Sequence, residues 1–285
     1  MVWLHGITNV KNNLFIYQQF MKLTVIVENH VSKSGLGAEH GLSFIIESNG
    51  KKMMFDTGQS KLYARNAKAL GYDIAAIDAL VISHGHYDHV GGLPHFIENN
   101  NQAPVYLKKE ALWPKFHDER YIGVKQTINA FNPRFKHVEN MLEVIDNVFI
   151  VTNIDAYFPD DSHKKGFFVK ENNSIVADNF ADELFLVLKT ENAISIVSSC
   201  SHNGITNIVE TARKTFNLPV YAVIGGFHIK NDTSSNVDKM INYFNLVGVR
   251  SVFTGHCTGI EKFVQFQTNF KGQTFYLETG TKLDL

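Results

Sequence analysis

The chain has 285 residues, of which 44% are hydrophobic and 19% charged, and its net charge is −1 with His counted as neutral. This composition excludes a wholly disordered chain and indicates a globular protein with a substantial core. Two cysteines exclude a disulfide framework, and no apolar run approaches the ~20 residues that span a bilayer. Because the chain also lacks a basic excess, we expect neither a nucleic acid nor a membrane as its partner.

The first 20 residues differ in pattern from the rest of the chain. They lack the uninterrupted apolar segment and the cleavage site of a secretory signal, and Met21 opens the first good strand pattern, 22–27. We therefore expect residues 1–20 to be an extension that is not native or is dispensable, with a short outer helix as the alternative. Residues 21–285 are expected to form the folded domain. Without an export signal, two cysteines fit a reducing cytoplasm, which is the predicted location.

The next segments alternate strands and helices. Asn49-Gly50 is a strong hairpin signal. Around it and after it, the pattern predicts strands at 41–47 and 52–56, a helix at 60–70 closed by Gly71, a buried strand at 78–83 and a strand at 103–107. The range 108–180 mixes aromatic and charged residues without a clear period, apart from strands near 142–152. We expect that range to be an insertion or cover.

The regular pattern returns in the second half. It predicts strands at 183–189 and 193–198, a helix at 205–216, a strand at 220–224, a helix at 235–246, a strand at 249–253, and a last helix and strand up to residue 277. Each half thus opens with hairpins and then alternates strand with helix. An α/β (α+β) fold satisfies that order, with two mixed sheets packed face to face, helices outside, and the histidine-bearing loops at one edge.

Four residues that could bind metal, three histidines and one aspartate, directly follow the buried strand in the segment Ser83-His84-Gly85-His86-Tyr87-Asp88-His89. His84 and His86 are two residues apart, so in an extended segment they point the same way. Asp88 and His89 begin the next helix and can turn toward a second point nearby. The spacing predicts two adjacent sets of metal ligands, and it disfavours the alternative of a merely solvated polar loop.

His84-x-His86-x-Asp88-His89 resembles the signature of the metallo-β-lactamase superfamily, whose fold is a four-layer αββα sandwich. Three further segments resemble parts of that family's site: Phe55-Asp56-Thr57-Gly58, Ser199-Cys200-Ser201-His202 and Thr254-Gly255-His256. The resemblance implies a first metal held by His84, His86 and His202. It implies a second metal held by Asp88, His89 and His256, with Asp88 also orienting the nucleophile. Asp56 would then hydrogen-bond the loop that carries these ligands.

A narrower resemblance is to the subgroup described as dihydropteroate-synthase-like or 7,8-dihydropterin-6-methyl-4-(β-D-ribofuranosyl)aminobenzene-5′-phosphate synthase-like. The segments that carry it are Glu39-His40-Gly41-Leu42-Ser43, Asp178-Asn179-Phe180-Ala181-Asp182-Glu183, Cys200-Ser201-His202-Asn203-Gly204-Ile205, Gly225-Gly226-Phe227-His228 and Gly255-His256-Cys257-Thr258-Gly259. This resemblance implies a pterin-like substrate and a synthase or transferase reaction.

The sequence departs from the superfamily at one position. Most members with two metals carry a bridging Asp after the strand that follows the third histidine, and His228 stands there instead. A neutral imidazole neither bridges two cations as a carboxylate does nor offsets their charge. We expect His228 to be a metal ligand or to contact the metal, with a substrate ligand or proton shuttle as the alternative. The second metal would then bind more weakly, or both sites would hold Mn²⁺ or Fe²⁺.

Other residues near these motifs have two interpretations each. Glu39 and His40 lie on a loop expected at the same edge, where they would support the site or line the substrate pocket, or simply cap a loop and face solvent. Phe227 would stack on a flat substrate or lie in the core. Cys200 and Cys257 are either zinc ligands or small buried residues. Five further histidines are expected at the surface or in the cover: His5, His95, His117, His137 and His163.

Together these residues predict a metal-dependent hydrolase of a small-molecule ester, lactone or phosphoester. A metal-bound hydroxide at a mono- or dinuclear site would be the nucleophile, with Asp88 and His228 as catalytic residues. Zn²⁺ is the expected cofactor, one or two per chain, with Mn²⁺ or Fe²⁺ as alternatives. The competing hypotheses are the pterin-related synthase and a non-catalytic, metal-containing ligand-binding protein. The sequence does not indicate an oligomeric state.

Overall fold

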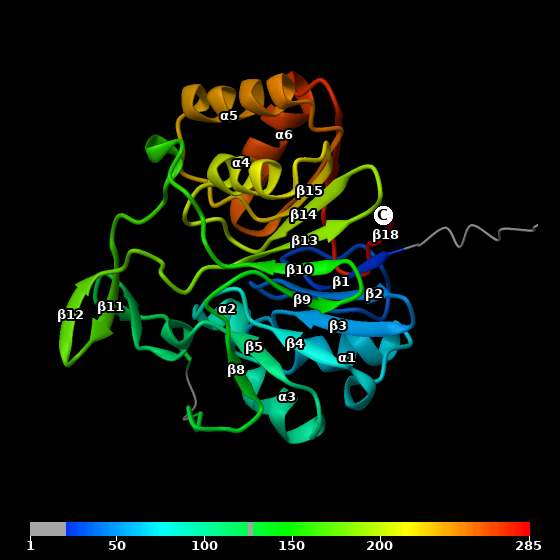
Figure 1. Cartoon of the computed structure of the whole chain (residues 1–285), viewed down its shortest axis with the longest axis vertical. Helices are drawn as coiled ribbons and strands as arrows, with labels where there is room; N and C mark the ends of the chain where they lie inside the picture. Colours follow the sequence, from blue (N-terminus) through cyan, green and yellow to red (C-terminus); the bar gives the residue numbers. More distant parts are fainter. Residues whose placement is uncertain (1–20, 125–127) are drawn as a thin grey trace, which may run out of the picture.

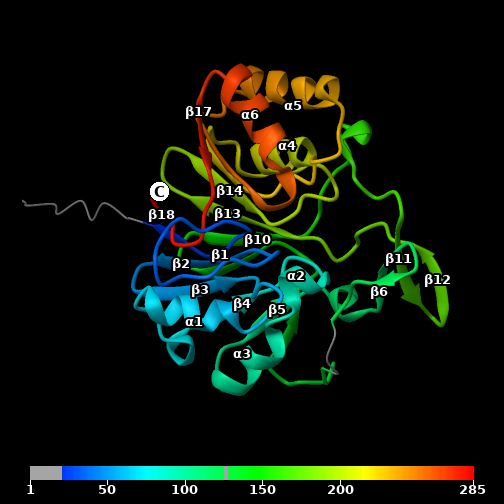
Figure 2. The same ribbon diagram turned by 180° about the vertical axis from the view of Figure 1, so that it is seen from behind.

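The computed structural model describes residues 21–124 and 128–285, so the expected extension 1–20 lies outside the described residues. Two seven-stranded sheets pack face to face, and helices cover the outer face of each (Figures 1 and 2). This is the four-layer αββα arrangement that the alternation of strands and helices predicts. Within the described residues, no helix is long and apolar enough to cross a membrane.

The first sheet has the order β18-β1-β2-β3-β4-β5-β8. Its strands are β1 (Lys22–Val27), β2 (Ser43–Ser48), β3 (Lys51–Phe55), β4 (Ala79–Val81), β5 (Val105–Leu107), β8 (Phe135–His137) and β18 (Lys282–Asp284). Asn49 and Gly50 join β2 to β3 with φ angles of 49° and 78°, which are the left-handed values that the hairpin turn requires. Strand β18, which the sequence pattern did not predict, pairs antiparallel with β1.

The second sheet has the order β17-β16-β15-β14-β13-β10-β9. Its strands are β9 (Leu142–Ile145), β10 (Val148–Val151), β13 (Phe185–Lys189), β14 (Ile194–Ser198), β15 (Val220–Gly225), β16 (Ser251–Thr254) and β17 (Gln273–Tyr276). Strands β14 to β17 run parallel, so their carboxyl ends meet at one edge of the sheet.

The helices form the two outer layers. On the first sheet lie α1 (Leu62–Ala69), α2 (Tyr87–Val90) and α3 (Leu93–Asn99); on the second lie α4 (Ile205–Phe216), α5 (Ser234–Val247) and α6 (Ile260–Asn269). Short 3₁₀ helices occur at Ile74–Ala76, Lys109–Leu112, Pro159–Asp161 and His256–Thr258. Helix α5 begins after Thr233, whose side chain accepts a hydrogen bond from the Asn236 amide, and ends at Gly248 with φ 75°.

Three apolar layers hold these elements together. The central layer lies between the sheets and includes Phe44 and Phe55 from the first sheet and Leu186 and Ile224 from the second. The other two lie between each sheet and its helices. Because the sheets are covered on both faces, their central strands are buried along almost their whole length, as β14 is.

The range 108–180, expected to be an insertion or cover, divides into two parts. Strands β8, β9 and β10 extend the main sheets. A separate four-stranded sheet of order β12-β11-β6-β7, here called the cover sheet, stands beside the sandwich (Figure 1). Its strands are β6 (Lys115–His117), β7 (Arg120–Tyr121), β11 (Phe167–Glu171) and β12 (Ser174–Ala177).

Candidate metal centre

The expected ligand residues lie on loops that leave the ends of β4, β14 and β16. The loop after β4 carries His84 and His86 and continues into α2, which holds Asp88 and His89. The loop after β14 carries His202, and His256 directly follows the end of β16 and Gly255. Each sheet therefore contributes side chains to the same place, and all six side chains are buried.

The first ligand set consists of His84, His86 and His202. Their ring centroids lie 4.6 Å (His84–His86), 5.2 Å (His84–His202) and 4.9 Å (His86–His202) apart. The Nε2 atom of each ring is buried and has no hydrogen-bond partner among the described residues. Buried polar atoms are rarely left unpaired, and three such imidazoles are a common ligand set of catalytic zinc. The first set therefore fits a metal ion.

The protonation of these rings also suits a metal. Burial, and next the neighbouring histidines, hold the pKa of His84 well below its usual value. Burial acts in the same way on the pKa of His86, as it does on the pKa of His202. Neutral imidazole is the form that binds metals, so the rings are ready to bind without first losing a proton.

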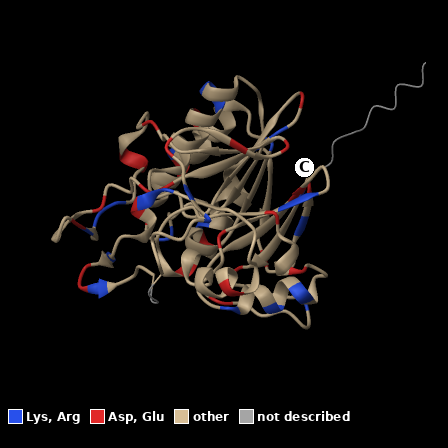
Figure 3. Ribbon diagram, turned by 60° about the horizontal axis from the view of Figure 1, so that its bottom comes forward, with Lys and Arg blue, Asp and Glu red and all other residues tan. Residues whose placement is uncertain are grey.

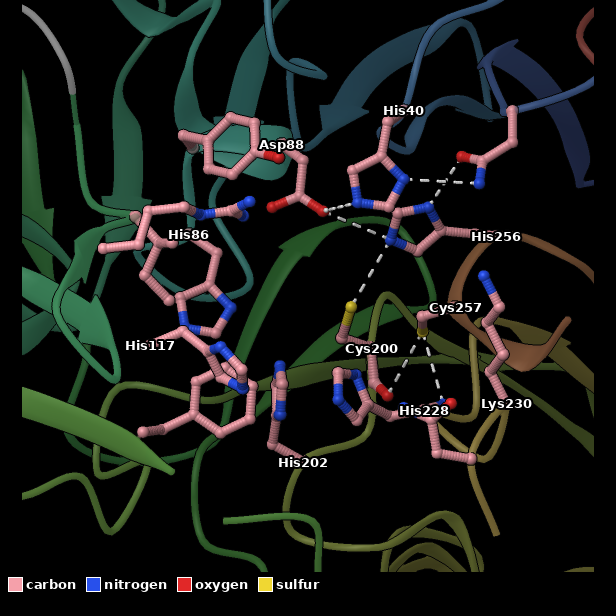
Figure 4. Close-up of a pocket in the computed structure, with 16 residues that line it drawn as sticks. His40, His86, Asp88, His117, Cys200, His202, His228, Lys230, His256 and Cys257 are labelled. Carbon is pink, nitrogen blue, oxygen red and sulfur yellow. Dashed lines mark hydrogen bonds and ion pairs between the residues drawn. The ribbon is translucent and has the colours of Figure 1, made fainter. Parts of the chain in front are cut away.

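The second ligand set is grouped around Asp88, which Figure 4 shows beside His40 and His256. Its Oδ2 lies 3.7 Å from His89 Nε2, 3.5 Å from His256 Nε2 and 3.2 Å from His40 Nε2. Burial opposes ionisation of Asp88, but His89, His40 and His256 outweigh it and hold the pKa of Asp88 well below its usual value. A carboxylate and several imidazoles at these separations are suitable ligands for a divalent cation.

Hydrogen bonds at Nδ1 orient four of the rings and leave Nε2 as the atom that can bind a metal. The partners are Ser83 Oγ for His84 (2.9 Å), Asp56 Oδ2 for His89 (2.9 Å), the His163 carbonyl for His202 (3.3 Å) and Asn29 Oδ1 for His256 (3.0 Å). Such contacts fix the orientation of metal-binding histidines. They place every Nε2 on the side where the two ligand sets meet.

Asp56 lies under both loops that carry the first ligands. Its fully buried carboxylate accepts hydrogen bonds from the Ser83 amide (2.7 Å), Ser83 Oγ (2.6 Å), His89 Nδ1 (2.9 Å) and Ser199 Oγ. Although burial opposes it, the carboxylates of Asp88 and Asp56 raise the pKa of His89 to about 9. Asp56 thus fixes the loops after β4 and β14 relative to one another.

Two further carboxylates, which the sequence analysis did not select, hold the backbone of the ligands. Glu183 accepts hydrogen bonds from the amides of His202 and Asn203, both at 2.7 Å. Glu28 accepts from the amide of His256, and burial raises the pKa of Glu28 to about 7. Glu183 ends a segment that carries the subgroup resemblance, whereas Glu28 has no spacing signal and could not have been found from the sequence.

Four of the six candidate ligands line a pocket with a cavity volume of about 300 Å³ (Figure 4): His86, Asp88, His202 and His256. Its wall combines the ligand loops with residues of the cover sheet and of the loop after β15: His117, Arg120, Ile122, Phe167, Lys230 and Asn231. His40 also lines the pocket and stacks on His256 with ring centroids 5.0 Å apart. Glu39 does not line it; the Glu39 carboxylate accepts from the Gln59 and Ser60 amides and so holds the loop before α1.

Comparison with known proteins agrees with this geometry. A family model described as the metallo-β-lactamase superfamily matches residues 36–163. A 7,8-dihydropterin-6-methyl-4-(β-D-ribofuranosyl)-aminobenzene-5′-phosphate synthase of Methanocaldococcus jannaschii is 31% identical over 282 residues, covering 91% of this chain and 95% of the relative. The chain belongs to the metallo-β-lactamase superfamily.

Two more relatives cover most of the chain. The crystal structure of Tm1679, described as a metal-dependent hydrolase of the β-lactamase superfamily, has 33% identity and a TM-score of 0.82, covering 93% of this chain and 99% of Tm1679. An uncharacterised protein of Methanocaldococcus jannaschii is 30% identical over 245 residues, covering 84% of this chain and 91% of that protein. The similarity therefore extends over the whole sandwich and is not confined to the ligand motif.

His228 stands where most two-metal members of the superfamily have a bridging carboxylate. Its ring centroid lies 4.1 Å from that of His202, and its Nδ1 is buried without a hydrogen-bond partner among the described residues. The candidate ligand atoms of His228, Cys200 and Cys257 all lie within 4.8 Å of one another. In the described part of the chain, no cluster of this kind contains His228 together with Asp88, His89 or His256. The structure thus brings His228 to the side of the first ligand set.

Phe227 requires a correction, because the structure does not place it in the pocket. Its side chain is fully buried between the second sheet and the helices, with ring centroids 6.2 Å from Phe244 and 5.6 Å from Phe266. The backbone turns at His228, which has a left-handed φ of 55°, and the His228 side chain faces the pocket while Phe227 faces the helices. Phe167 and Tyr87 are the aromatic residues that line the pocket instead.

The sequence analysis missed two of the histidines near the site. His117, on β6, lines the pocket, and His163 donates its backbone amide to the His202 carbonyl at 2.8 Å. Both lie in the range 108–180, where the sequence shows no period and no ligand spacing. Only the folded cover sheet and the loop before it bring these residues to the superfamily site.

Proposed function

We propose that this protein is a metal-dependent hydrolase of a small, anionic ester, lactone or phosphoester. The observation that carries the proposal is the pair of adjacent ligand sets at one pocket: His84, His86 and His202 in one, and Asp88, His89 and His256 in the other. A bound divalent metal, for which Zn²⁺ is our first choice, polarises the substrate and makes water nucleophilic at neutral pH. The relationship to Tm1679, a metal-dependent hydrolase, supports this reaction class.

The protein's own side chains contribute orientation and proton transfer. Asp88 is buried and ionised, so its second oxygen can accept a hydrogen bond from an attacking water and turn a lone pair toward the substrate. His228 faces the same pocket and can pass a proton to the leaving group. The cover sheet closes one side of the pocket and reduces the access of bulk water to the reacting atoms.

Charge at the pocket rim indicates the substrate class. Arg120, on the cover sheet, and Lys230, after β15, are exposed and line the pocket together with His117. Elsewhere Lys and Arg are interspersed with Asp and Glu, without a continuous basic face in the view of Figure 3. A local pair of cations favours a phosphate or carboxylate on a small molecule over a nucleic-acid backbone.

A second candidate function is a pterin-related synthase, favoured by the 31% identity to the archaeal synthase over 91% of the chain. Tyr87 and Phe167 line the pocket and could stack on a flat heterocycle. The phosphate in that relative's product name also matches a cationic rim. This function shares the metal centre with the hydrolase and differs in the bond that is made or broken.

The deciding experiment is a turnover and binding screen of protein loaded with Zn²⁺, Mn²⁺ or Fe²⁺. We expect hydrolysis of at least one anionic ester, lactone or phosphodiester, and its loss in the Asp88→Asn variant. Quenching of a reduced pterin's fluorescence without hydrolysis of any of these compounds would favour the synthase. Binding without any turnover would identify a ligand-binding protein and overturn the hydrolase.

The Arg120→Gln variant tests the cationic rim. We expect KM for an anionic substrate to rise about 10–100-fold while kcat changes little, because a charge-assisted contact made equally in ground and transition states is lost. Lys109→Gln, at an exposed lysine after β5 that does not line the pocket, is the matched control. An unchanged KM for Arg120→Gln, or an equal rise in the control, would show that Arg120 does not bind the anion.

The His228→Ala variant tests proton transfer. We expect kcat to fall about 10²–10⁴-fold, the usual contribution of a positioned acid or base, with the metal content unchanged. Elemental analysis and steady-state kinetics measure the two effects separately. His137→Ala, at an exposed histidine ending β8, should change neither. Loss of metal from His228→Ala would instead make His228 a ligand.

A further inference from the structure

Because His228 stands where most two-metal members of the superfamily have a bridging carboxylate, that position supplies no anion for the two ligand sets to share. One buried side chain approaches both sets. Cys200 Sγ lies within 4.8 Å of a ring nitrogen of His84 and of His202, which belong to the first set. It also lies within 4.8 Å of a ring nitrogen of His89 and of His256, which belong to the second. We propose that Cys200 is a thiolate ligand shared by the two metals.

The distances around the second ligand set support this role. Cys200 Sγ lies 3.2 Å from His89 Nε2 and 3.5 Å from His256 Nε2, and Asp88 Oδ2 lies 3.7 Å and 3.5 Å from the same two atoms. Zinc bonds of about 2.0–2.3 Å at tetrahedral angles separate neighbouring ligand atoms by about 3.3–3.6 Å. Cys200 Sγ and Asp88 Oδ2 thus each lie from the same two imidazole nitrogens at about the separation of neighbouring ligands on one cation.

The first ligand set supplies no negative charge of its own. His84, His86 and His202 are neutral imidazoles that supply three donors and no charge, so a dication held by them alone is uncompensated. Cys200 is 3% exposed, follows β14 two residues before His202, and reaches this set as well. A single shared thiolate therefore gives both sets the negative charge that His228 does not bring.

The second cysteine provides a contrast. Cys257 is partly exposed; its Sγ accepts a hydrogen bond from the His228 amide at 3.3 Å and donates one to the Cys200 carbonyl at 3.7 Å. Among the described residues, its ligand atom groups only with Cys200 and His228 and with no member of either imidazole set. Cys257 is consequently a matched control of the same residue type in the same pocket (Figure 4).

The test is spectroscopic and uses the full chain. Metal-free protein is titrated with Co²⁺, and sulfur-to-cobalt charge transfer is followed in the near ultraviolet. We expect the band to grow over two equivalents, to disappear in Cys200→Ser and to persist in Cys257→Ser. Cys200→Ser should also bind the second equivalent at least about tenfold more weakly. A band that saturates at one equivalent, that survives Cys200→Ser, or that is lost in Cys257→Ser would overturn the shared ligand.

X-ray absorption of the unmodified zinc protein decides the matter even if Cys200→Ser does not fold. A shared thiolate gives about one sulfur per zinc at about 2.3 Å, whereas a terminal thiolate gives half that number and no thiolate gives none. The last two results would refute the proposal. The inference rests only on the metal centre of the proposed function. A sulfur signal without hydrolysis would support the shared Cys200 ligand and count against the hydrolase. Hydrolysis without a sulfur signal would refute the shared ligand and leave the hydrolase standing.

Discussion

Replacing Asp56 by Ala should lower the free energy of unfolding by about 3–5 kcal/mol and abolish tight binding of the second metal. The reason is that four donors from two separate loops converge on this one carboxylate. His89, whose pKa is raised to about 9 by the carboxylates of Asp88 and Asp56, would also lose one of the two groups that stabilise its charged form. Denaturant unfolding of the metal-free protein and elemental analysis of the purified protein measure the two effects.

Two variants separate the charge of Asp56 from its position. Asp56→Asn keeps an acceptor of the same shape, so we expect partial stability and metal affinity weakened about 10–100-fold. Glu191→Ala, at an exposed acid in the turn between β13 and β14, should change neither quantity. If Asp56→Ala retained both metals with its stability unchanged, the supporting role of Asp56 would be wrong.

The second large effect is expected at Lys115, where a buried ion network joins the cover sheet to the ligand loop. Lys115 is 1% exposed, and its Nζ lies 2.7 Å from Asp178 and 2.9 Å from Asp182. Asp182 also accepts from the amide of Gly85, between His84 and His86, at 2.7 Å. Lys115→Met should lower the free energy of unfolding by about 3–5 kcal/mol, because it leaves two buried carboxylates without a cation.

A triple variant isolates the cause of that loss. Lys115→Met combined with Asp178→Asn and Asp182→Asn removes all three charges, so it should recover most of the stability measured by denaturant unfolding. Lys170→Met, on an exposed lysine of β11 in the same cover sheet, serves as the control and should be neutral. A triple variant no more stable than Lys115→Met would show that packing of the lysine stem, and not its charge, is what matters.

Local patterns in the sequence were sufficient to predict the four-layer sandwich. The Asn49-Gly50 turn, the buried strand before His84 and the predicted helix at 205–216 each depend on neighbouring residues, and the structure contains all three. Strand β18 was missed because three residues are too few to show alternation, and its pairing partner β1 lies at the other end of the described chain. A long-range pairing of that kind leaves no local pattern.

The site was only partly predictable for the same reason. The residues from His84 to His89 are close in sequence, so their spacing alone indicates a metal site. Arg120, His117 and Glu28 reach the site only through folding of distant segments, and nothing in their surroundings along the chain distinguishes them. Phe227 was misplaced because adjacency to His228 in sequence says nothing about the face on which a side chain emerges.

Each ligand set draws on both sheets, and this has a consequence for how the metals are acquired during synthesis. The emerging chain exposes His84 to His89 long before His202 and His256 have been made, and an incomplete set of this kind holds a cation weakly. Under the proposed function, metal capture would therefore wait until the second sheet has formed its parallel strands against the first. The metal content of the protein would then measure whether the two sheets have packed together. A chain whose synthesis stops before His256 should bind little metal even when metal is in excess.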